Sequence, residues 1–290
     1  MTKHARFFVP PEAFAGDQVV ILGQPVHRIR RVLRLRPGDS ITLLDNKGGQ
    51  YQVKLTALEQ NGVRGLIMDK TPAPPAPATH ITLYQALLRG DHFEYVLQKG
   101  TEIGVTAFVP LLCHRCEATA HRRHRWQQII QEAAEQCRRG GIPTLYPPLP
   151  FDEACYHVGG LSLLPWEEET VVGLRDVITP LPTAVNILVG PEGGFTAQEV
   201  ELARGQGIQV VTLGGHLLRS ETAGVIAAAI VLYEKGELGA ASDKGPHSSK
   251  EKVAAEEDEE TTDEEKQPLI HRRSYQATPP GHHERHQAIP

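Results

Sequence analysis

Short runs of alternating hydrophobic and polar residues mark the first 70 positions of the chain. Segments rich in Asn and Gly separate these runs at residues 46–49 and 60–62. Alternation with a period of two between such turns is typical of antiparallel hairpins. We therefore predict a small β-domain over residues 1–72. Its strands are expected at Ile41–Leu44, Tyr51–Leu55 and Val63–Met68.

A proline-rich segment, Pro72-Ala-Pro-Pro-Ala-Pro77, follows. Prolines at this density make a stiff, extended chain, so we predict a linker over residues 73–79. Over residues 80–238, short apolar runs alternate with segments of helical period, which indicates an α/β fold with a mainly parallel sheet. The expected strands are Ile81–Ala86, Ala107–Leu112, Asn186–Val189 and Val210–Leu213. The expected helices are Asp91–Ile103, Arg122–Arg138, Ala197–Arg204 and Thr222–Tyr233.

Two of these strands lead directly into glycine-rich turns. Gly190-Pro-Glu-Gly-Gly194 follows the first, and Gly214-Gly215 follows the second. Ligands bind at the carboxyl ends of parallel strands, and glycine lets a backbone approach a ligand closely. The helix after the first turn opens on a capping box, Thr196-Ala-Gln-Glu199. Neither turn has a phosphate-binding motif, and Glu192 would repel a phosphate. The pattern favours a flat, polar small molecule, although the glycines by themselves also suit plain tight turns.

Charge is distributed unevenly along the 290 residues. The formal net charge is −5, of which −4 lies in residues 241–290, where 7 Lys and Arg face 11 Asp and Glu. We predict that residues 239–290, acidic and rich in histidine, form a disordered tail. The remainder is close to neutral, which still allows RNA binding through local basic patches.

Basic residues cluster at Arg28, Arg30, Arg31, Arg34 and Arg36, with aliphatic residues between them. Two interpretations stay open: the solvated face of an amphipathic helix, or a surface that contacts phosphates. The same two apply to His121–Arg125 and to Arg138-Arg139. Lys99 and Glu102 are three apart on an expected helix, which predicts a local ion pair.

Membrane and metal signals are weak in this sequence. No apolar run approaches the roughly 20 residues that a membrane span needs, and no signal peptide opens the chain. We therefore expect a cytoplasmic protein without a membrane partner.

Cys113-His-Arg-Cys116 has the spacing of a zinc half-site, but no second pair follows at a standard distance. Free thiols are the favoured interpretation, and no metal is expected.

Five motifs, in order, resemble one family. LVGPEGGFTAQE followed by LGGHLLRSETA is similar to the RsmE family of ribosomal RNA uridine methyltransferases, in the SPOUT superfamily. The resemblance covers roughly residues 6–236 and includes Arg6–Pro10, Arg31–Asp39, Leu97–Val105 and Arg125–Arg139. It implies a mainly parallel sheet with a trefoil knot near the carboxyl end, preceded by a PUA-like β-barrel that holds RNA. It also implies a homodimer packed through the knotted domain.

The resemblance further implies an enzyme that uses S-adenosylmethionine to methylate N3 of a uridine in 16S ribosomal RNA, within the small subunit. Arg219 and Glu221 are the candidate catalytic residues. The implied RNA-binding residues are Arg6, Arg28, Arg30, Arg31, Arg34, Arg125 and Arg139. The implied cofactor-binding residues are Leu188, Val189, Gly190, Pro191, Glu192, Gly193, Gly194, Leu213, Gly214, Leu218, Arg219 and Thr222.

Other functions remain open on the sequence alone. A related methyltransferase could act on another ribosomal or transfer RNA nucleoside. A non-catalytic RNA-binding module would need no cofactor, which the intact glycine turns disfavour. A metabolic nucleotide-binding enzyme is disfavoured by the missing phosphate motifs. For Arg219, a surface ion pair with Glu221 or Glu192 is the plain alternative, and such pairs contribute little to stability.

Overall fold

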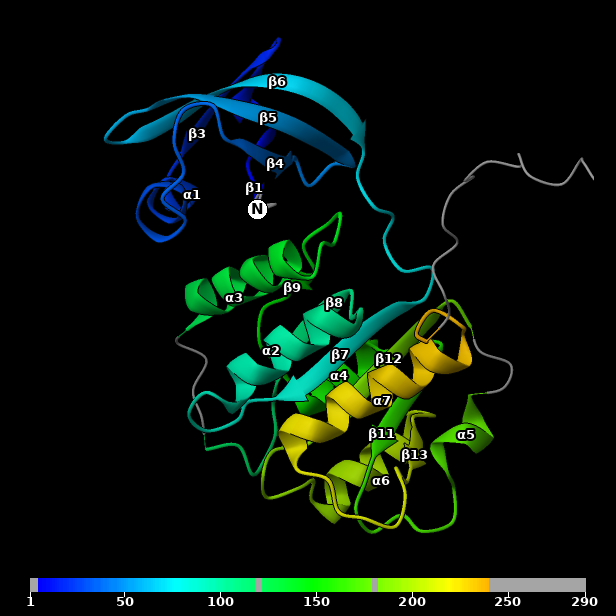
Figure 1. Cartoon of the computed structure of the whole chain (residues 1–290). Coiled ribbons are helices and arrows are strands. Elements are labelled where there is room, and N and C mark those ends of the chain that lie inside the picture. The colour runs from blue at the N-terminus through cyan, green and yellow to red at the C-terminus, as the bar shows by residue number, and fades with distance from the viewer. Residues whose placement is uncertain (1–4, 118–121, 179–181, 240–290) are drawn as a thin grey trace, which may run out of the picture. The chain divides into compact units, whose positions relative to one another are not determined.

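The computed structural model describes residues 5–117, 122–178 and 182–239 (Figure 1). Two sheets organise this part of the chain, one in the first 72 residues and one from residue 80 onward. Almost all of the predicted acidic tail lies outside the described residues, as does His121.

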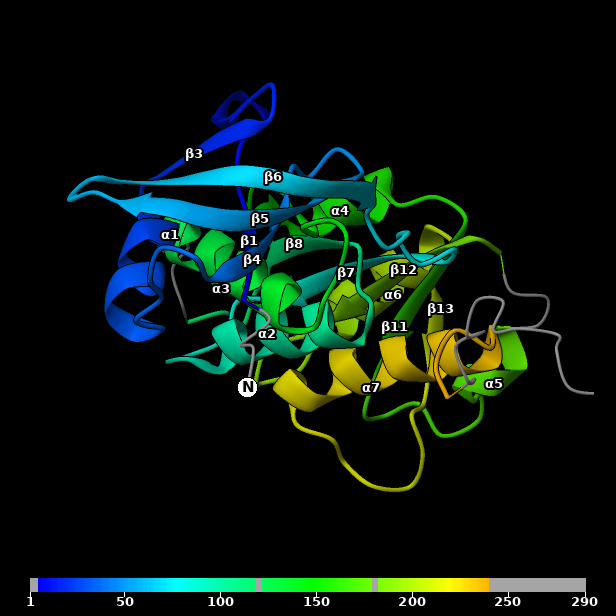
Figure 2. The same ribbon diagram turned by 45° about the horizontal axis from the view of Figure 1, so that its top comes forward.

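The first sheet is mixed and six-stranded, in the order β1-β4-β5-β6-β3-β2. The predicted hairpins are confirmed: β4 pairs antiparallel with β5, and β5 with β6 (Figure 2). Alternation decides the faces, because Tyr51, Val53 and Leu55 are buried whereas Gln52 and Lys54 are exposed. The strands are β1 Arg6–Phe8, β2 Phe14–Ala15, β3 Gln18–Leu22, β4 Ser40–Leu44, β5 Gly49–Leu58 and β6 Gly62–Pro72.

The arginine cluster does not form one amphipathic helix. A short helix, α1 (Gln24–His27), continues as a π-helical turn over Arg28–Val32 and then ends. Arg34 has a φ of 52°, a left-handed conformation that helices exclude. Ile29 is fully buried in the β-domain core, so burial of the aliphatic residues shapes this segment more than helical period does.

The second sheet is parallel throughout, in the order β10-β8-β7-β12-β11-β13, with β9 paired to β8. The predicted parallel α/β sheet is confirmed. Three of its strands, β9, β10 and β11, were not predicted. β11 lies between the two strands that carry the glycine turns, so those strands are not neighbours. The strands are β7 His80–Ala86, β8 Ala107–Leu112, β9 Thr144–Leu145, β10 Leu149–Pro150, β11 Leu161–Pro165, β12 Ala184–Val189 and β13 Gln209–Val211.

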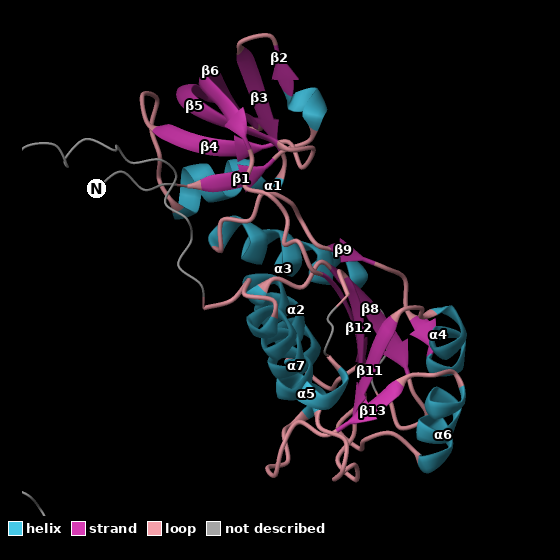
Figure 3. Ribbon diagram, turned by 90° about the vertical axis from the view of Figure 1, so that its right-hand side faces the viewer, coloured by secondary structure: helices cyan, strands magenta, loops and turns pink. Residues whose placement is uncertain are grey.

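Helices cover both faces of this sheet. Figure 3 shows α2 and α7 on one face and α4 and α6 on the other, each face with its own apolar core. The four predicted helices are confirmed within a few residues, whereas α4 and α5 were not predicted. Their bounds are α2 His92–Ile103, α3 Arg123–Gln136, α4 Phe151–His157, α5 Leu174–Val177, α6 Ala197–Gly205 and α7 Ser220–Glu234.

α7 returns the chain from the edge strand β13 to the middle of the sheet, where it packs on β7 and β12. Close packing depends on Gly224, since a Cβ there would lie 3.0 Å from Oε1 of Gln85 and 3.1 Å from the Leu83 side chain. This return brings the start of α7 beside the first glycine turn. The trefoil knot itself stays a prediction. None of the helices in the described ranges is long and apolar enough to cross a membrane.

Candidate functional site

The first glycine loop, residues 190–196, follows β12 and is folded tightly. The Gly194 N–H donates to the Pro191 carbonyl at 2.9 Å, which closes a turn. Gly194 has a φ of 68°, and a Cβ at this position would overlap Oε1 of Glu167. Both features require glycine here.

The predicted capping box closes the other end of this loop. The Glu199 N–H donates to Oγ1 of Thr196 at 3.2 Å, and the Thr196 N–H donates to Oε2 of Glu199 at 2.8 Å. The start of α6 is thereby hydrogen-bonded on both sides. The sequence prediction of this helix start is confirmed.

Residues distant in sequence hold the first loop from outside. The Arg89 N–H donates to Oε1 of Glu192 at 2.8 Å. The Arg115 guanidinium donates to the carbonyls of Gly193 at 2.6 Å and Phe195 at 3.3 Å. Sequence reasoning missed both arginines, because their loop partners lie 78 or more positions away.

The second loop, residues 212–219, is open by comparison. Gly214 has a φ of 120° and its N–H donates to Oγ1 of Thr212 at 3.2 Å. A Cβ on Gly214 or Gly215 would meet no described atom within 4 Å. Residues 214–217 are all exposed. This loop therefore leaves free space where the first loop is packed.

The two loops meet at the start of α7. The Ser220 hydroxyl donates to the carbonyl of Gly190, and the Gln85 side-chain amide donates to Oγ of Ser220 at 3.2 Å. Arg219, which precedes the helix, has a side chain 83% exposed. Its guanidinium lies 3.9 Å from a Glu221 carboxylate that is 14% exposed, so the plain ion-pair interpretation has a geometric basis.

Two of the predicted cofactor residues are core residues. The Leu188 side chain is fully buried on the α4–α6 face, and the Val189 side chain is buried on the α2–α7 face. Alternate residues of a strand point to opposite faces, so both sides of β12 are used for packing. The Leu188 side chain is therefore part of the core, and a role of this residue in cofactor binding stays a prediction. Leu213, Leu218 and Thr222 are partly buried and line the start of the second loop and of α7.

The loops suit a nucleoside-like ligand. They bring glycine backbone from two strand ends together, with Pro191 and Glu192 in the first loop. Gly190 is tightly packed, since a Cβ would lie 3.1 Å from the Phe195 ring. Gly193 faces the Arg115 stem, with 3.4 Å from its Cβ position to Cδ. Gly214 and Gly215, by contrast, have open space around them, since a Cβ at either would meet no described atom within 4 Å.

The predicted RNA-binding arginines divide into several groups. Arg31 and Arg34 are exposed and form no ion pair within the described ranges. Arg30 donates to the Gln60 carbonyl at 2.8 Å. Arg28 pairs instead with the buried carboxylate of Glu135 and is about one-third exposed. Arg125 lies 3.5 Å from Glu94.

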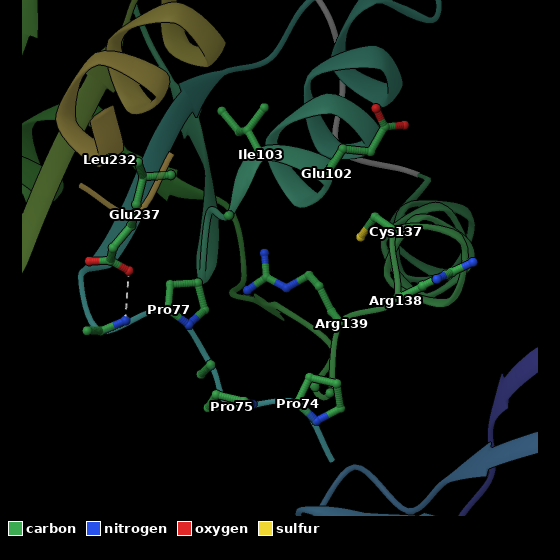
Figure 4. A pocket seen from close by; sticks show the side chains of 15 residues that line it. Pro74, Pro75, Pro77, Glu102, Ile103, Cys137, Arg138, Arg139, Leu232 and Glu237 are labelled. Carbon is green, nitrogen blue, oxygen red and sulfur yellow. Dashed lines mark hydrogen bonds between the residues drawn. The ribbon is translucent and has the colours of Figure 1, made fainter. Parts of the chain in front are cut away.

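Arg139 points inward, and its role as a phosphate contact stays a prediction. Its guanidinium lies in a cavity of about 380 Å³ beside prolines 74–77 (Figure 4). It donates to the carbonyls of Thr101 at 3.0 Å and Val105 at 2.8 Å, at the end of α2. Burial lowers the pKa of Arg139. This arginine satisfies one carbonyl in the last turn of α2 and one just beyond its end, a common role for a cation there.

Arg6 is partly buried, and its Nε and Nη2 have no hydrogen-bond partner among the described residues. Burial, together with the nearby charge of Arg138, lowers the pKa of Arg6.

The predicted ion pair of Lys99 and Glu102 is confirmed, with 2.9 Å between Nζ and Oε1.

All four cysteines are free thiols. In the part of the chain that the structure describes, His, Cys, Asp and Glu form no group of three that could hold a metal ion. The Cys113 thiol, hydrogen-bonded to Cys116, lowers the pKa of Cys116 to about 7, whereas burial raises the pKa of Cys155 to about 12.

Comparison with known proteins shows which families and proteins this chain is similar to. An RNA methyltransferase domain family matches residues 74–232, and an RNA methyltransferase PUA domain family matches residues 26–67. Ribosomal RNA small subunit methyltransferase E of Synechocystis sp. is 35% identical over 231 residues, which is 77% of this chain and 76% of that protein. The Bacillus subtilis protein of the same name is 29% identical, over 74% of this chain and 89% of its own length.

Solved structures agree. Ribosomal RNA small subunit methyltransferase E from Neisseria gonorrhoeae, bound to S-adenosylmethionine, is 34% identical with a TM-score of 0.73 and covers 80% of this chain and 98% of that one. A putative methyltransferase from Legionella pneumophila, also with S-adenosylmethionine, is 28% identical with a TM-score of 0.75 over the same shares. The implied combination of a PUA-like domain and a SPOUT-type methyltransferase domain is confirmed.

Proposed function

Since this chain belongs to the ribosomal RNA small subunit methyltransferase E family, we propose that it methylates N3 of a uridine in 16S ribosomal RNA, with S-adenosylmethionine as methyl donor. The observation that carries the proposal is the meeting of the two glycine loops at Ser220 and Gly190. This hydrogen bond brings the first loop next to the start of α7, which directly follows the second loop. Such a substrate also places the protein in the cytoplasm.

Bound S-adenosylmethionine supplies an electrophilic methyl group, so the work left to the protein concerns the acceptor. Uridine N3 carries a weakly acidic proton and becomes nucleophilic when that proton leaves. Glu221, with its side chain 14% exposed at the start of α7, is our candidate base. Arg219 would stabilise negative charge developing on the uracil oxygens, and the helix N-terminus favours the same charge. The target base must be unpaired or flipped, because N3 is a pairing atom.

The RNA surface that we propose centres on Arg30, Arg31 and Arg34. No aromatic residue is interleaved with them, so contact with phosphates fits better than stacking on bases. Replacing all three with Glu should weaken RNA binding and leave cofactor binding intact. The salt dependence should flatten by roughly 0.7–0.9 in log–log slope for each lost contact. If the triple variant bound RNA with normal affinity and normal salt dependence, this segment would be only a solvated surface.

We also propose a homodimer through the α7 side of the second domain. Ile226 and Tyr233 lie on one face of α7 and are 38% and 65% exposed, and Leu217 nearby is 83% exposed. Residues seven apart share one side of a helix, so this face is apolar and uncovered in a single chain. Sedimentation velocity should show a dimer, and Ile226→Glu should give a monomer.

Two measurements test the activity. Calorimetry should show one S-adenosylmethionine site per chain. Mapping of modified nucleosides should then find one N3-methylated uridine missing from the 16S ribosomal RNA of a strain that lacks the gene, and restored by the intact gene. Binding of RNA without any cofactor would favour a non-catalytic module. A missing modification on another nucleoside or on transfer RNA would keep the methyltransferase and change its substrate.

A further inference from the structure

We propose that Arg115 is a positioning residue that holds the first glycine loop in the shape that binds S-adenosylmethionine. The inference deepens the proposed function and rests on it. Arg115 belongs to the turn Cys113-His-Arg-Cys116, which follows β8.

The contact is made by one guanidinium nitrogen and two main-chain carbonyls. Nη1 of Arg115 lies 2.6 Å from the Gly193 oxygen and 3.3 Å from the Phe195 oxygen. The aliphatic stem of Arg115 lies against Gly193, where a Cβ would come within 3.4 Å of Cδ. The Arg115 side chain therefore holds the loop through its main chain.

Two peptide planes of the loop are thereby held at both ends. In the plane between Gly193 and Gly194, Arg115 binds the carbonyl and the Pro191 carbonyl accepts the N–H at 2.9 Å. In the plane between Phe195 and Thr196, Arg115 again binds the carbonyl. There the Thr196 N–H donates to Glu199 at 2.8 Å. A peptide plane held at both ends cannot rotate freely, so the loop is pre-organised before a ligand arrives.

Arg115 is itself held in place by a closed turn. The Cys116 N–H donates to the Cys113 carbonyl at 3.0 Å, and the Cys113 N–H donates to Sγ of Cys116 at 3.3 Å. The His114 N–H donates to Oε1 of Glu199 at 2.8 Å, while the other oxygen of that carboxylate closes the capping box. The turn is joined to the loop by the two hydrogen bonds of Arg115 and to α6 by that of His114, so a change at Arg115 is transmitted to the loop.

A positioning role predicts that removal of Arg115 weakens cofactor binding, whereas an effect of its charge alone predicts that removal strengthens it. S-adenosylmethionine carries a net positive charge, from a sulfonium and an ammonium against one carboxylate, and an arginine nearby would repel it. If Arg115 acted only through its charge, its removal would tighten binding of this cation. S-adenosylhomocysteine lacks the sulfonium charge, and its binding would change less. If Arg115 positions the loop, both ligands lose affinity equally.

The experiment compares Arg115→Ala and Arg115→Lys with the unchanged protein, by calorimetry with each ligand. We expect Arg115→Ala to raise the Kd about tenfold for both ligands, roughly the loss of one charge-assisted hydrogen-bonding group. Arg115→Lys, which keeps the charge and one donor, should recover part of the affinity. RNA affinity should not change. Arg64→Ala, which removes an exposed arginine from β6, is the matched control and should leave both Kd values unaltered.

Each outcome separates the two proposals. If the unchanged protein binds neither ligand, the proposed function fails. If it binds both and Arg115→Ala binds them equally well or more tightly, the positioning role is overturned and the function stands. A melting temperature within a few degrees of the unchanged protein shows that the variant is folded. Should Arg115→Ala not fold, Arg115→Lys decides: its Kd must rise severalfold for both ligands, and an unaltered Kd overturns the proposal.

Discussion

The two glycine loops begin alike and end differently. Each follows the carboxyl end of a short apolar strand of the parallel sheet. The first is tied to Arg89, Arg115 and the capping box at its end. The second is exposed from residue 214 to residue 217 and has open space around Gly214 and Gly215. Glycines after a strand therefore do not decide how rigid a loop is; the neighbouring elements decide it.

This difference suggests a division of labour in the proposed reaction. A loop held at many points binds a ligand at a low cost in conformational entropy. A loop with few contacts can adjust when RNA arrives. We therefore expect changes in the first loop to alter cofactor affinity, and changes in the second loop and at the start of α7 to alter turnover.

The largest effect is expected from Gly194→Val in the first loop. Valine is disfavoured at the φ of 68° and would overlap Glu167. The strained backbone and the overlap with Glu167 together correspond to about a hundredfold loss of S-adenosylmethionine affinity. Calorimetry measures it, with circular dichroism to check the fold. Binding within threefold of normal would show that the loop tolerates a different shape.

Arg219→Ala tests the expectation that changes at the start of α7 alter turnover. We expect kcat to fall about a hundredfold, the usual cost of losing one group that stabilises developing charge. The Kd for S-adenosylmethionine should hardly change, because the side chain is 83% exposed and the first loop is intact. Single-turnover methylation of small-subunit RNA measures the rate. An unchanged rate would leave Arg219 as a surface partner of Glu221.

The thiol of Cys116 reports on the turn Cys113–Cys116, which contacts the first of the two loops. The hydrogen bond from Cys113 lowers the pKa of Cys116 to about 7. The thiolate is the reactive form, so alkylation by iodoacetamide should rise about tenfold per pH unit below pH 7 and level off above it. Cys155, whose pKa burial raises to about 12, is the internal control and should stay unlabelled. Mass spectrometry of the labelled peptides measures both. A midpoint near pH 9 for Cys116 would contradict the geometry of the turn.

Thr196→Ala removes the hydroxyl of the capping box. We expect a loss of about 1 kcal/mol in the free energy of unfolding, as for other N-cap substitutions. Cofactor affinity should fall severalfold, since the Glu199 carboxylate loses one of its partners in the first loop. Thr196→Ser keeps the hydroxyl and should behave as the unchanged protein. Urea unfolding distinguishes the two variants.

The smallest effect is expected from Gly215→Ala in the second loop. A methyl group there meets no described atom within 4 Å and the residue does not have a positive φ. The Kd for S-adenosylmethionine should stay within about twofold, less than 0.5 kcal/mol. A large loss would place the ligand against Gly215 itself.

Local sequence patterns were sufficient to predict much of the structure of this protein. The hairpin strands, the parallel sheet and the start of α6 at Thr196 were all predicted, because each depends on residues within a few positions of one another. The family motifs also lie in continuous segments. Their match predicted the two domain types and the cofactor, which periodicity alone could not.

Only the tertiary structure decided what surrounds the glycine loops. It placed β11 between the two strands, turned the Leu188 side chain into the core and directed Arg139 to the carbonyls of α2. It also brought Arg115 to Gly193 and Ser220 to Gly190, which are 78 and 30 positions apart. An arginine or serine makes the same hydrogen bonds with many partners, so the residue type does not specify which one it meets. The packing of the sheet and its helices makes that choice.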